Sequence, residues 1–341
     1  MILKIGDKNV DKFSEFNFVL KYDSVASTFS FNFFFDPNNP EHKALFKPCS
    51  YQQVTLEHNG ELLLTGTILS HQFYRGAVSQ LAGIAGYSLP GVLEDCEIPV
   101  DSYPLQSDGL TLRQIAGKYA AKFGLKMLVD PLVSKRMDEV YTTTTASEGQ
   151  TVKAYLAEIA SQKNIILSHT EKGELYFTKS KASQNPIINY SDGVPFTDIK
   201  LEVNGQAMHS SITVIKQASI DGGNAGQAAI ANPYVTAFRP KVKTQSSGTD
   251  NNTSGAAKST LASELQNIKL IITTDRWVVD GKILKPNTVI SIISPGNYIY
   301  SKTNFFIESI SFTGDAEKTI ATMSCVLPEV HNGETPKNIF N

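Results

Sequence analysis

The stretch Thr28-Phe29-Ser30-Phe31-Asn32-Phe33 decides the fold of the N-terminal part, because every second residue is an aromatic ring. A period of two is typical of a strand with one face in a core. The same alternation precedes it over residues 16–22, so we expect two neighbouring strands. Further along, Asn59-Gly60 is a strong hairpin signal between apolar runs at 54–58 and 61–65. With two more runs at 68–74 and 78–85, the first hundred residues predict a barrel or a sandwich.

The middle of the chain changes from the strand period to the helix period. Apolar residues recur on one helical face over 112–123 and again over 152–160. Gly124 and Asn164 follow these stretches as candidate helix ends. We therefore predict an α+β unit from Pro99 to about Lys181, built as helix–strand and then helix–hairpin. The strands expected in this unit are 125–129, 165–168 and 175–179. No internal repeat of fixed period is evident in the chain.

The last third of the chain returns to strands. Residues 221–263 are dominated by Gly, Ser, Thr, Asn and Ala, which predicts a flexible loop. A short helix is expected to start near Ser259, and the polar tail after Pro328 is expected to be loose. The strands expected here are 196–203, 211–216, 270–274, 289–293, 305–313 and 319–326.

The composition excludes several classes of protein. The chain has 341 residues, and 31 Lys and Arg stand against 33 Asp and Glu. The net charge of −2 lacks the basic excess of a general nucleic-acid binder. Hydrophobic residues make up 41%, enough for a sizeable core. Charged residues make up 19%, below the roughly 25% of an average globular protein. This low charge favours a protein that uses part of its surface for contacts.

The sequence also indicates a compartment. The N-terminus has no basic segment followed by an apolar one, and no apolar run approaches the roughly 20 residues of a membrane span. The three cysteines, Cys49, Cys96 and Cys325, are too few and too far apart for a disulfide scaffold or a metal cluster. We expect a soluble protein, made in a reducing compartment, with no membrane insertion.

No catalytic motif is found. None of the six histidines stands at metal-ligand spacing from another, and no phosphate-cradling or dinucleotide-binding glycine motif occurs. Residues 86–91 resemble a nucleophile elbow only superficially, since Pro90 would break the helix that must follow. Glu94, Asp95 and Glu97 could do acid–base work or bind a cation, but a solvated or interface cluster is the simpler interpretation. We therefore predict no enzymatic activity, no metal site and no cofactor.

One segment leaves an alternative open. Residues 141–160 contain Glu148-Gly149-Gln150-Thr151-Val152, which resembles the start of a LysM peptidoglycan-binding module. The simpler interpretation is an ordinary helix with Thr151 as its N-cap. The alternative function is thus a module that binds peptidoglycan or the surface of a host cell. A cell-wall hydrolase is a third possibility, for which no paired carboxylate or Cys–His arrangement is evident.

Five motifs in order resemble those of a known family, the baseplate hub protein of contractile-tailed phages typified by protein P of phage Mu. The hub part of type VI secretion spikes is a more distant relative. Tyr87 replaces the usual Arg of the third motif, and Leu284 stands where a second Trp is common in the last one. The motifs are the polar turn and strand 23–31, the hairpin 59–66, the exit 86–96, the sequence Phe238-Arg239-Pro240 and the strand–turn 277–287.

The resemblance implies a fold of two tandem β-barrel-like domains with an α+β domain inserted, three chains forming a trimeric ring. It implies a first barrel at 1–96, completed by strands from about 190–216, and an inserted domain at 97–185. A second barrel is expected at 186–330, containing the flexible loop 221–263. Residues 331–341 form the C-terminal tail.

The resemblance also implies a function. Such a protein is a structural hub of a phage or prophage-derived contractile tail, a homotrimer that matches the six-fold tail tube to the three-fold central spike. Its partners would be itself, the tube protein, the spike protein and other baseplate proteins, with no nucleic-acid specificity. It would be located in the virion tail baseplate and assembled in the bacterial host cytoplasm. The candidate interface residues are Arg239, Pro240, Trp277 and Asn287.

Overall fold

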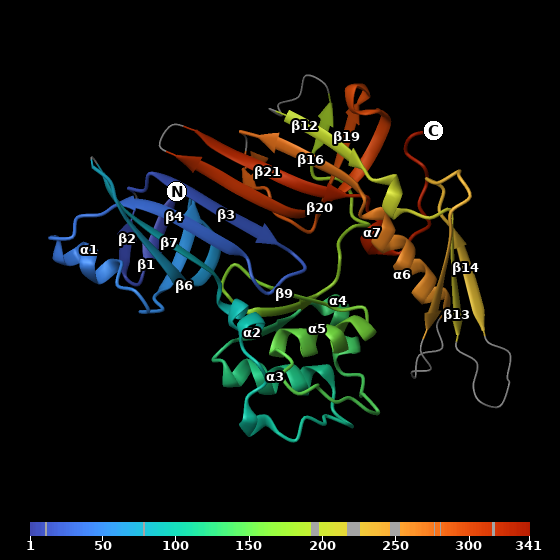
Figure 1. The fold of residues 1–341 in the computed structure, drawn as a ribbon, viewed down its shortest axis with the longest axis horizontal. Helices are drawn as coiled ribbons and strands as arrows, with labels where there is room; N and C mark the ends of the chain where they lie inside the picture. Colours follow the sequence, from blue (N-terminus) through green and yellow to red (C-terminus); the bar gives the residue numbers. More distant parts are fainter. Residues whose placement is uncertain are drawn as a thin grey trace. The chain divides into compact units, whose positions relative to one another are not determined.

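The computed structural model describes residues 1–10, 12–77, 79–191, 198–216, 226–245, 253–275, 277–279, 281–315 and 318–341. The chain forms two compact units. Unit 1 consists of Met1–Lys179 with Ser311–Ile320, and unit 2 consists of Ser180–Ile310 with Ala321–Asn341. Strands dominate both units and pair mostly antiparallel, as Figure 1 shows. The predicted mainly β fold class is confirmed.

The aromatic stretch quoted above forms the centre of the main sheet of unit 1, in which the strands follow the order β3-β4-β7-β6-β5-β1-β2. Phe29, Phe31 and Phe33 are buried and lie on one face of β4, as their spacing predicts. The helix α1 (Pro40–Leu45) follows this strand. The strands are β1 (Ile2–Ile5), β2 (Lys8–Val10), β3 (Glu15–Lys21), β4 (Thr28–Phe34), β5 (Gln53–His58), β6 (Glu61–Arg75) and β7 (Gln80–Ser88).

Strand β6 differs from the prediction, because the two runs expected at 61–65 and 68–74 form one continuous strand. Gly66, which lies between the runs, makes no turn. A Cβ atom at this position would lie 2.3 Å from the carbonyl oxygen of Tyr87 in β7. The glycine therefore permits a close approach of two strands, which a sequence pattern does not distinguish from a turn signal.

The α+β part of unit 1 packs two helices, α3 (Leu112–Lys122) and α5 (Val152–Gln162), on the small sheet β8-β10-β9. Figure 1 shows α3 and α5 side by side. Leu167 and Phe177 of the sheet share one hydrophobic core with both helices. The remaining elements are η1 (Leu89–Gly91), α2 (Val92–Asp95), η2 (Val100–Ser102), β8 (Met127–Val129), α4 (Pro131–Met137), β9 (Ile166–His169) and β10 (Leu175–Thr178).

This part contains an internal repeat that the sequence analysis missed. Gly109 and Gly149 both have positive φ, at 74° and 71°. Each is followed two residues later by a threonine N-cap and a helix of 11 residues. The helices end alike, since Leu125 N donates to Ala120 O and Ile165 N donates to Ala160 O. Beyond the acidic–Gly–x–Thr turn few side chains are identical between the copies, so the repeat is clearest in the backbone.

Unit 2 contains strands on both sides of β19 and β21. Strand β19 pairs with β11 and β20, and β16 pairs with β12 and β21.

The strands at 189–203, expected to complete the first barrel, thus pair inside unit 2, whereas unit 1 receives Ser311–Ile320. Local patterns identify strands but not distant partners. The domain boundaries given above stay a prediction. The elements are β11 (Asn189–Ser191), β12 (Asp198–Val203), η3 (Gly205–Ala207), β16 (Ile268–Thr274), β17 (Val278–Val279), β18 (Lys282–Ile283), β19 (Thr288–Ser294), η4 (Pro295–Asn297), β20 (Ile299–Asp315), β21 (Thr319–Val326) and α7 (Glu329–Asn332).

A second, three-stranded sheet in unit 2 corrects the prediction of a flexible loop over 221–263. The loop contains β14 (Gln227–Ala231), β15 (Pro240–Gln245) and helix α6 (Thr253–Leu265), while 221–225 and 246–252 lie outside the described residues. Both strands pair with β13 (Ser211–Lys216), and α6 packs on β13 and β14 (Figure 1). Among the small side chains of this stretch, Ala257 and Thr260 of α6 are buried.

The C-terminal tail is attached to unit 2 rather than loose. Tyr234 Oη donates a hydrogen bond of 2.6 Å to Lys337 O, and Asn338 Nδ2 donates one of 3.1 Å to Pro233 O. The Phe340 ring packs against Tyr234 and Tyr298. The tail is polar overall, but the aromatic ring of Phe340 attaches it to unit 2.

Candidate functional site

The predicted interface residues fall into two different environments. Arg239 and Pro240 are exposed at the start of β15. The Arg239 guanidinium donates to Met208 O and Gln206 O, which fixes the backbone that leads into the strand. The adjacent Phe238 is 91% exposed, the largest exposed fraction among the large apolar side chains described. An aromatic ring in this position is available for contact with another molecule.

Trp277 and Asn287 lie within the chain's own structure. Trp277 is only 5% exposed, and its carbonyl oxygen accepts a hydrogen bond from Leu284 N. Asn287 adopts a positive φ of 63°, and its side chain accepts a hydrogen bond from Lys181 N. These contacts give both residues a role in folding. The structure does not group them with Arg239 and Pro240, and the interface role of all four stays a prediction.

Helix α6 covers one face of the β14-β13-β15 sheet. Ile212 and Val214 of β13 are buried on the helix side. The alternate residues, which we call the open face, are Ser211, Thr213, Ile215, Gln227, Ala229, Ala231, Pro240, Val242 and Thr244. Val242 on this face is 65% exposed. The open face and Phe238 together form a surface of small and apolar side chains next to the edge of β15, which has no strand partner among the described residues, a combination typical of protein contacts.

Glu264 fixes α6 to this sheet. The carboxylate is 5% exposed, and it accepts hydrogen bonds from His209 N at 2.9 Å, His209 Nδ1 at 2.7 Å and Lys241 Nζ at 2.9 Å. Both donors come from the chain around the sheet, and Glu264 comes from the helix. A buried carboxylate that accepts three hydrogen bonds holds the two elements in one relative position.

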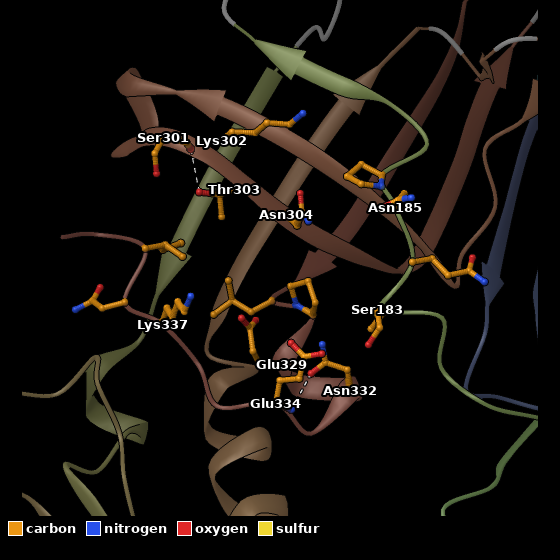
Figure 2. Close-up of a pocket in the computed structure, with 17 residues that line it drawn as sticks. Ser183, Asn185, Ser301, Lys302, Thr303, Asn304, Glu329, Asn332, Glu334 and Lys337 are labelled. Carbon is orange, nitrogen blue, oxygen red and sulfur yellow. Dashed lines mark hydrogen bonds between the residues drawn. The ribbon is translucent and has the colours of Figure 1, made fainter.

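A polar cavity of about 790 Å³ lies elsewhere in unit 2. Figure 2 shows Ser301, Thr303 and Asn304 on β20 along one side of it, and Glu329 and Glu334 on the other. The remaining wall is formed by residues 182–186, 302, 327–328, 332 and 337–339. Most lining side chains are amides, hydroxyls and charged groups. Since small-molecule pockets are mostly apolar, this lining suits a hydrogen-bonding ligand better.

Glu329 is the most unusual group in this cavity. Its Oε2 atom is buried and has no hydrogen-bond partner in the described part of the chain. Burial is the main cause that raises the pKa of the Glu329 carboxyl, and the neighbouring Glu334 raises it further. Lys337 is close enough to lower this pKa, but the net change is upward. Lys302 also lines the cavity, and among these charged groups the Glu329 Oε2 atom lacks a hydrogen-bond partner in the described part of the chain.

The other residues considered for chemistry have structural partners. Tyr87 Oη donates a hydrogen bond of 2.6 Å to Asp95, and Glu94 pairs with Lys153 at 3.2 Å. Glu97 forms a backbone bridge to Thr151. No group of three potential metal ligands is found among the described residues. The expectation of no catalysis and no cofactor stays a prediction.

The segment 141–160 forms part of a core. Thr151 Oγ1 accepts a hydrogen bond of 3.2 Å from Ala154 N, so it is the N-cap that the sequence indicates. Tyr155, Leu156 and Ile159 are buried against α3 and the small sheet. The acidic–Gly–x–Thr turn occurs a second time at Asp108–Thr111. Its occurrence in both copies of the repeat is explained by helix capping and favours that interpretation over glycan binding.

Comparisons with known proteins identify the fold. No protein-family model and no curated protein sequence matches the chain. Among solved structures, the chain superposes on the 43 kDa tail protein of prophage MuSo2 from Shewanella oneidensis with a TM-score of 0.82. The match covers 97% of this chain and 98% of that one at 20% identity. The chain has the fold of phage tail proteins.

Two further structures share the phage tail fold. A tail protein from Neisseria meningitidis MC58 gives a TM-score of 0.79 at 18% identity over 97% of both chains. An E. coli component of the type VI secretion system, described as similar to T4 bacteriophage tail proteins gp27 and gp5, gives a TM-score of 0.54 at 10% identity. That match covers 99% of this chain and 80% of the other. The resemblance deduced from the sequence motifs is confirmed at the level of the fold. Separately, no described helix has the length and apolar character needed to cross a membrane.

Proposed function

We propose that this protein is a structural component of the baseplate of a phage or prophage-derived contractile tail. The observation that carries the proposal is the likeness in fold to tail proteins over 97% of the chain. In this role the protein acts through contacts and not through catalysis. It would be located in the virion tail baseplate and assembled in the cytoplasm of the bacterial host.

The finer proposal is a homotrimeric hub. A six-fold tail tube and a three-fold spike can be joined by a ring of three chains if each chain offers two comparable attachment surfaces. Two units of similar size, each built on antiparallel strands, support this arrangement. The partners of the hub would be the tube protein, the central spike protein and other baseplate proteins.

The open face supplies a surface on which the three chains could meet. It combines an unpaired edge strand, β15, with the exposed ring of Phe238 and with Arg239 and Pro240. Strand edges and exposed aromatic rings are favourable for pairing between copies of a chain. We propose that this surface contributes to the trimer interface.

The native mass in solution tests the trimer. One chain has a mass of 37.3 kDa, so a trimer would have a mass of about 112 kDa. Light scattering on a sizing column should give this value over a tenfold range of concentration, and electron microscopy of the same peak should show rings with three-fold symmetry. A monomer at every concentration, also after the spike and tube proteins from the same gene cluster are added, would contradict the hub.

A further inference from the structure

Strand β20 is longer than its neighbour β21 and extends past the end of that strand. Along its first half it pairs with β19, from Ile299 to Ile307. The neighbour β21 ends at Val326. Strands β20 and β21 are hydrogen-bonded neighbours, and Asp315 N donates to Lys318 O where they meet, so antiparallel pairing places Val326 beside the middle of β20. The part of β20 around Ser301–Asn304 therefore extends beyond the end of β21.

The direction of the backbone in β20 follows from its partner. Val289 O and Ser291 N form hydrogen bonds with residues 187 and 188, on the β11 side of β19. Backbone groups alternate along a strand, so Ile292 directs its N–H and C=O toward β20, where it pairs with Thr303. Thr303 thus faces β19, and the next residue, Asn304, faces the opposite edge.

This opposite edge is free at Asn304. The chain that leaves β21 continues through Leu327 and Pro328 into α7, and Pro328 has no N–H group to donate. The backbone of Asn304 consequently has no strand partner on this side among the residues that the structure describes. The polar cavity borders the same edge, since Ser301–Asn304 line it (Figure 2).

We propose that the cavity is a docking slot for an extended segment of another polypeptide, which pairs with the free edge of β20 and places a lysine or arginine side chain against Glu329. The addition of a strand satisfies the backbone of Asn304. The cation satisfies the buried Oε2 atom of Glu329. The inference does not depend on the hub assignment, because any partner with such a segment would fit.

The dimensions and the lining favour a peptide over a small molecule. The edge formed by four residues is about 13 Å long, at about 3.3 Å per residue. A cavity of about 790 Å³ along it accommodates a short strand. Ser183, Asn185 and Asn332 supply donors and acceptors around the slot, as Figure 2 shows. A polypeptide backbone can use such groups along its whole length.

Synthetic hexapeptides test the proposal. One set has alternating Thr and Val with a single Lys at each position in turn, and a second set has Gln in place of Lys. Binding to the full-length protein is measured by fluorescence anisotropy. We expect at least one Lys peptide to bind with a Kd below about 100 μM, and its Gln counterpart to bind at least tenfold more weakly. Hydrogen exchange should show that the Asn304 amide becomes protected when this peptide binds.

Two variants of the protein test whether the peptide binds at this cavity. Glu329→Gln should weaken the Lys peptide about tenfold, whereas Glu334→Gln, an exposed carboxylate in the same wall, should change its affinity less than threefold. A peptide with Pro beside the Lys should bind poorly, because it lacks a backbone donor.

Three results would overturn the proposal. The first is no binding of any Lys peptide at 1 mM, and the second is equal binding of the Lys, Gln and Pro peptides. The third is a change of native mass caused by Glu329→Gln alone, which would identify the occupant as a second copy of this chain instead of another polypeptide.

Discussion

Thr111 and Thr151 make the same hydrogen bond at equivalent positions of two consecutive helices. Thr111 Oγ1 accepts from Gln114 N at 3.2 Å, and Thr151 Oγ1 accepts from Ala154 N at 3.2 Å. Only the first is a full capping box, since Gln114 also accepts from Thr111 N. The two copies thus keep the backbone motif while their side chains have diverged.

Replacement of either threonine should destabilise the α+β part. Thr111→Ala and Thr151→Ala each remove the acceptor for a helix N–H, and each should lower the free energy of unfolding by about 1 kcal/mol. Urea unfolding followed by circular dichroism measures this change. Thr→Ser at the same positions is the control and should retain most of the stability. If alanine and serine have equal effects, the caps do not stabilise these helices.

The Glu264 carboxylate should be important for the β14-β13-β15 sheet. Glu264→Gln keeps the shape of the side chain but removes the charge shared with His209 and Lys241, so we expect a loss of about 3 kcal/mol. Glu202→Gln is the matched control, because its partner Lys200 and Glu202 itself are exposed. That change should leave the thermal stability nearly unchanged. Similar losses for the two variants in thermal unfolding would contradict the prediction.

Phe238 should act on assembly and not on stability. Phe238→Ser removes a ring that is 91% exposed, so the free energy of unfolding should change by less than about 0.5 kcal/mol. The native mass should fall from about 112 kDa toward 37.3 kDa if the open face forms the trimer interface. Phe34→Ser, an exposed aromatic in unit 1, should leave the mass unchanged. A stable trimer of the Phe238 variant would locate the interface elsewhere.

Prolines at two neighbouring positions of β20 should destabilise the protein to very different extents. Thr303→Pro removes an N–H that bonds to β19 and should destabilise unit 2 by about 3 kcal/mol or more. Asn304→Pro removes an N–H on the free edge, where proline is tolerated, and should cost less than about 1 kcal/mol. Thermal unfolding of the two variants compares them directly. The reverse order would show that the free edge has been assigned to the wrong side of the strand.

His169 should make stability depend on pH. Burial lowers the pKa of His169 and outweighs the hydrogen bond between Nδ1 and Ser24 O, which measures 2.7 Å. The unfolded chain binds a proton at the ordinary pKa of about 6.5, whereas the folded chain binds it only at a lower pH. Stability is therefore fully present above pH 6.5 and falls as the pH drops through 6 toward 5. His169→Gln should lose less stability over this interval in urea unfolding, and an unchanged slope would refute the role of His169.

The sequence predicts the elements of this fold better than their partners. The aromatic alternation of β4 and the helical faces of α3 and α5 are local patterns, and the structure contains all three. The pairing of β13 with both β14 and β15 joins residues across a stretch of small side chains. Such a stretch has the composition of a linker, because close packing and flexibility both favour small residues.

The candidate site could likewise be predicted only in part from the sequence. Arg239 and Pro240 were found from a motif, and they lie at an exposed strand start next to Phe238. Nothing in the sequence near Glu329 indicates an unsatisfied carboxylate, since its environment depends on the end of β21 and on residues 182–186. The free edge of β20 likewise results from a difference in strand length. The polar composition of the tail likewise does not indicate that its residues 337–339 line a cavity.

The assignment of Ser311–Ile320 to unit 1 has a consequence for synthesis of the protein. Phe312 stacks on Phe18 with ring centroids 4.6 Å apart, and Ser311 bonds to Asn17 across 294 positions of sequence. A ribosome must therefore make nearly the whole chain before the N-terminal core can close. Until then the nascent chain exposes the phenylalanine-rich edge of β3, and incomplete chains can associate with one another through this edge. This protein should consequently require protection by chaperones during translation, and residues 1–179 alone should be a poor choice for expression.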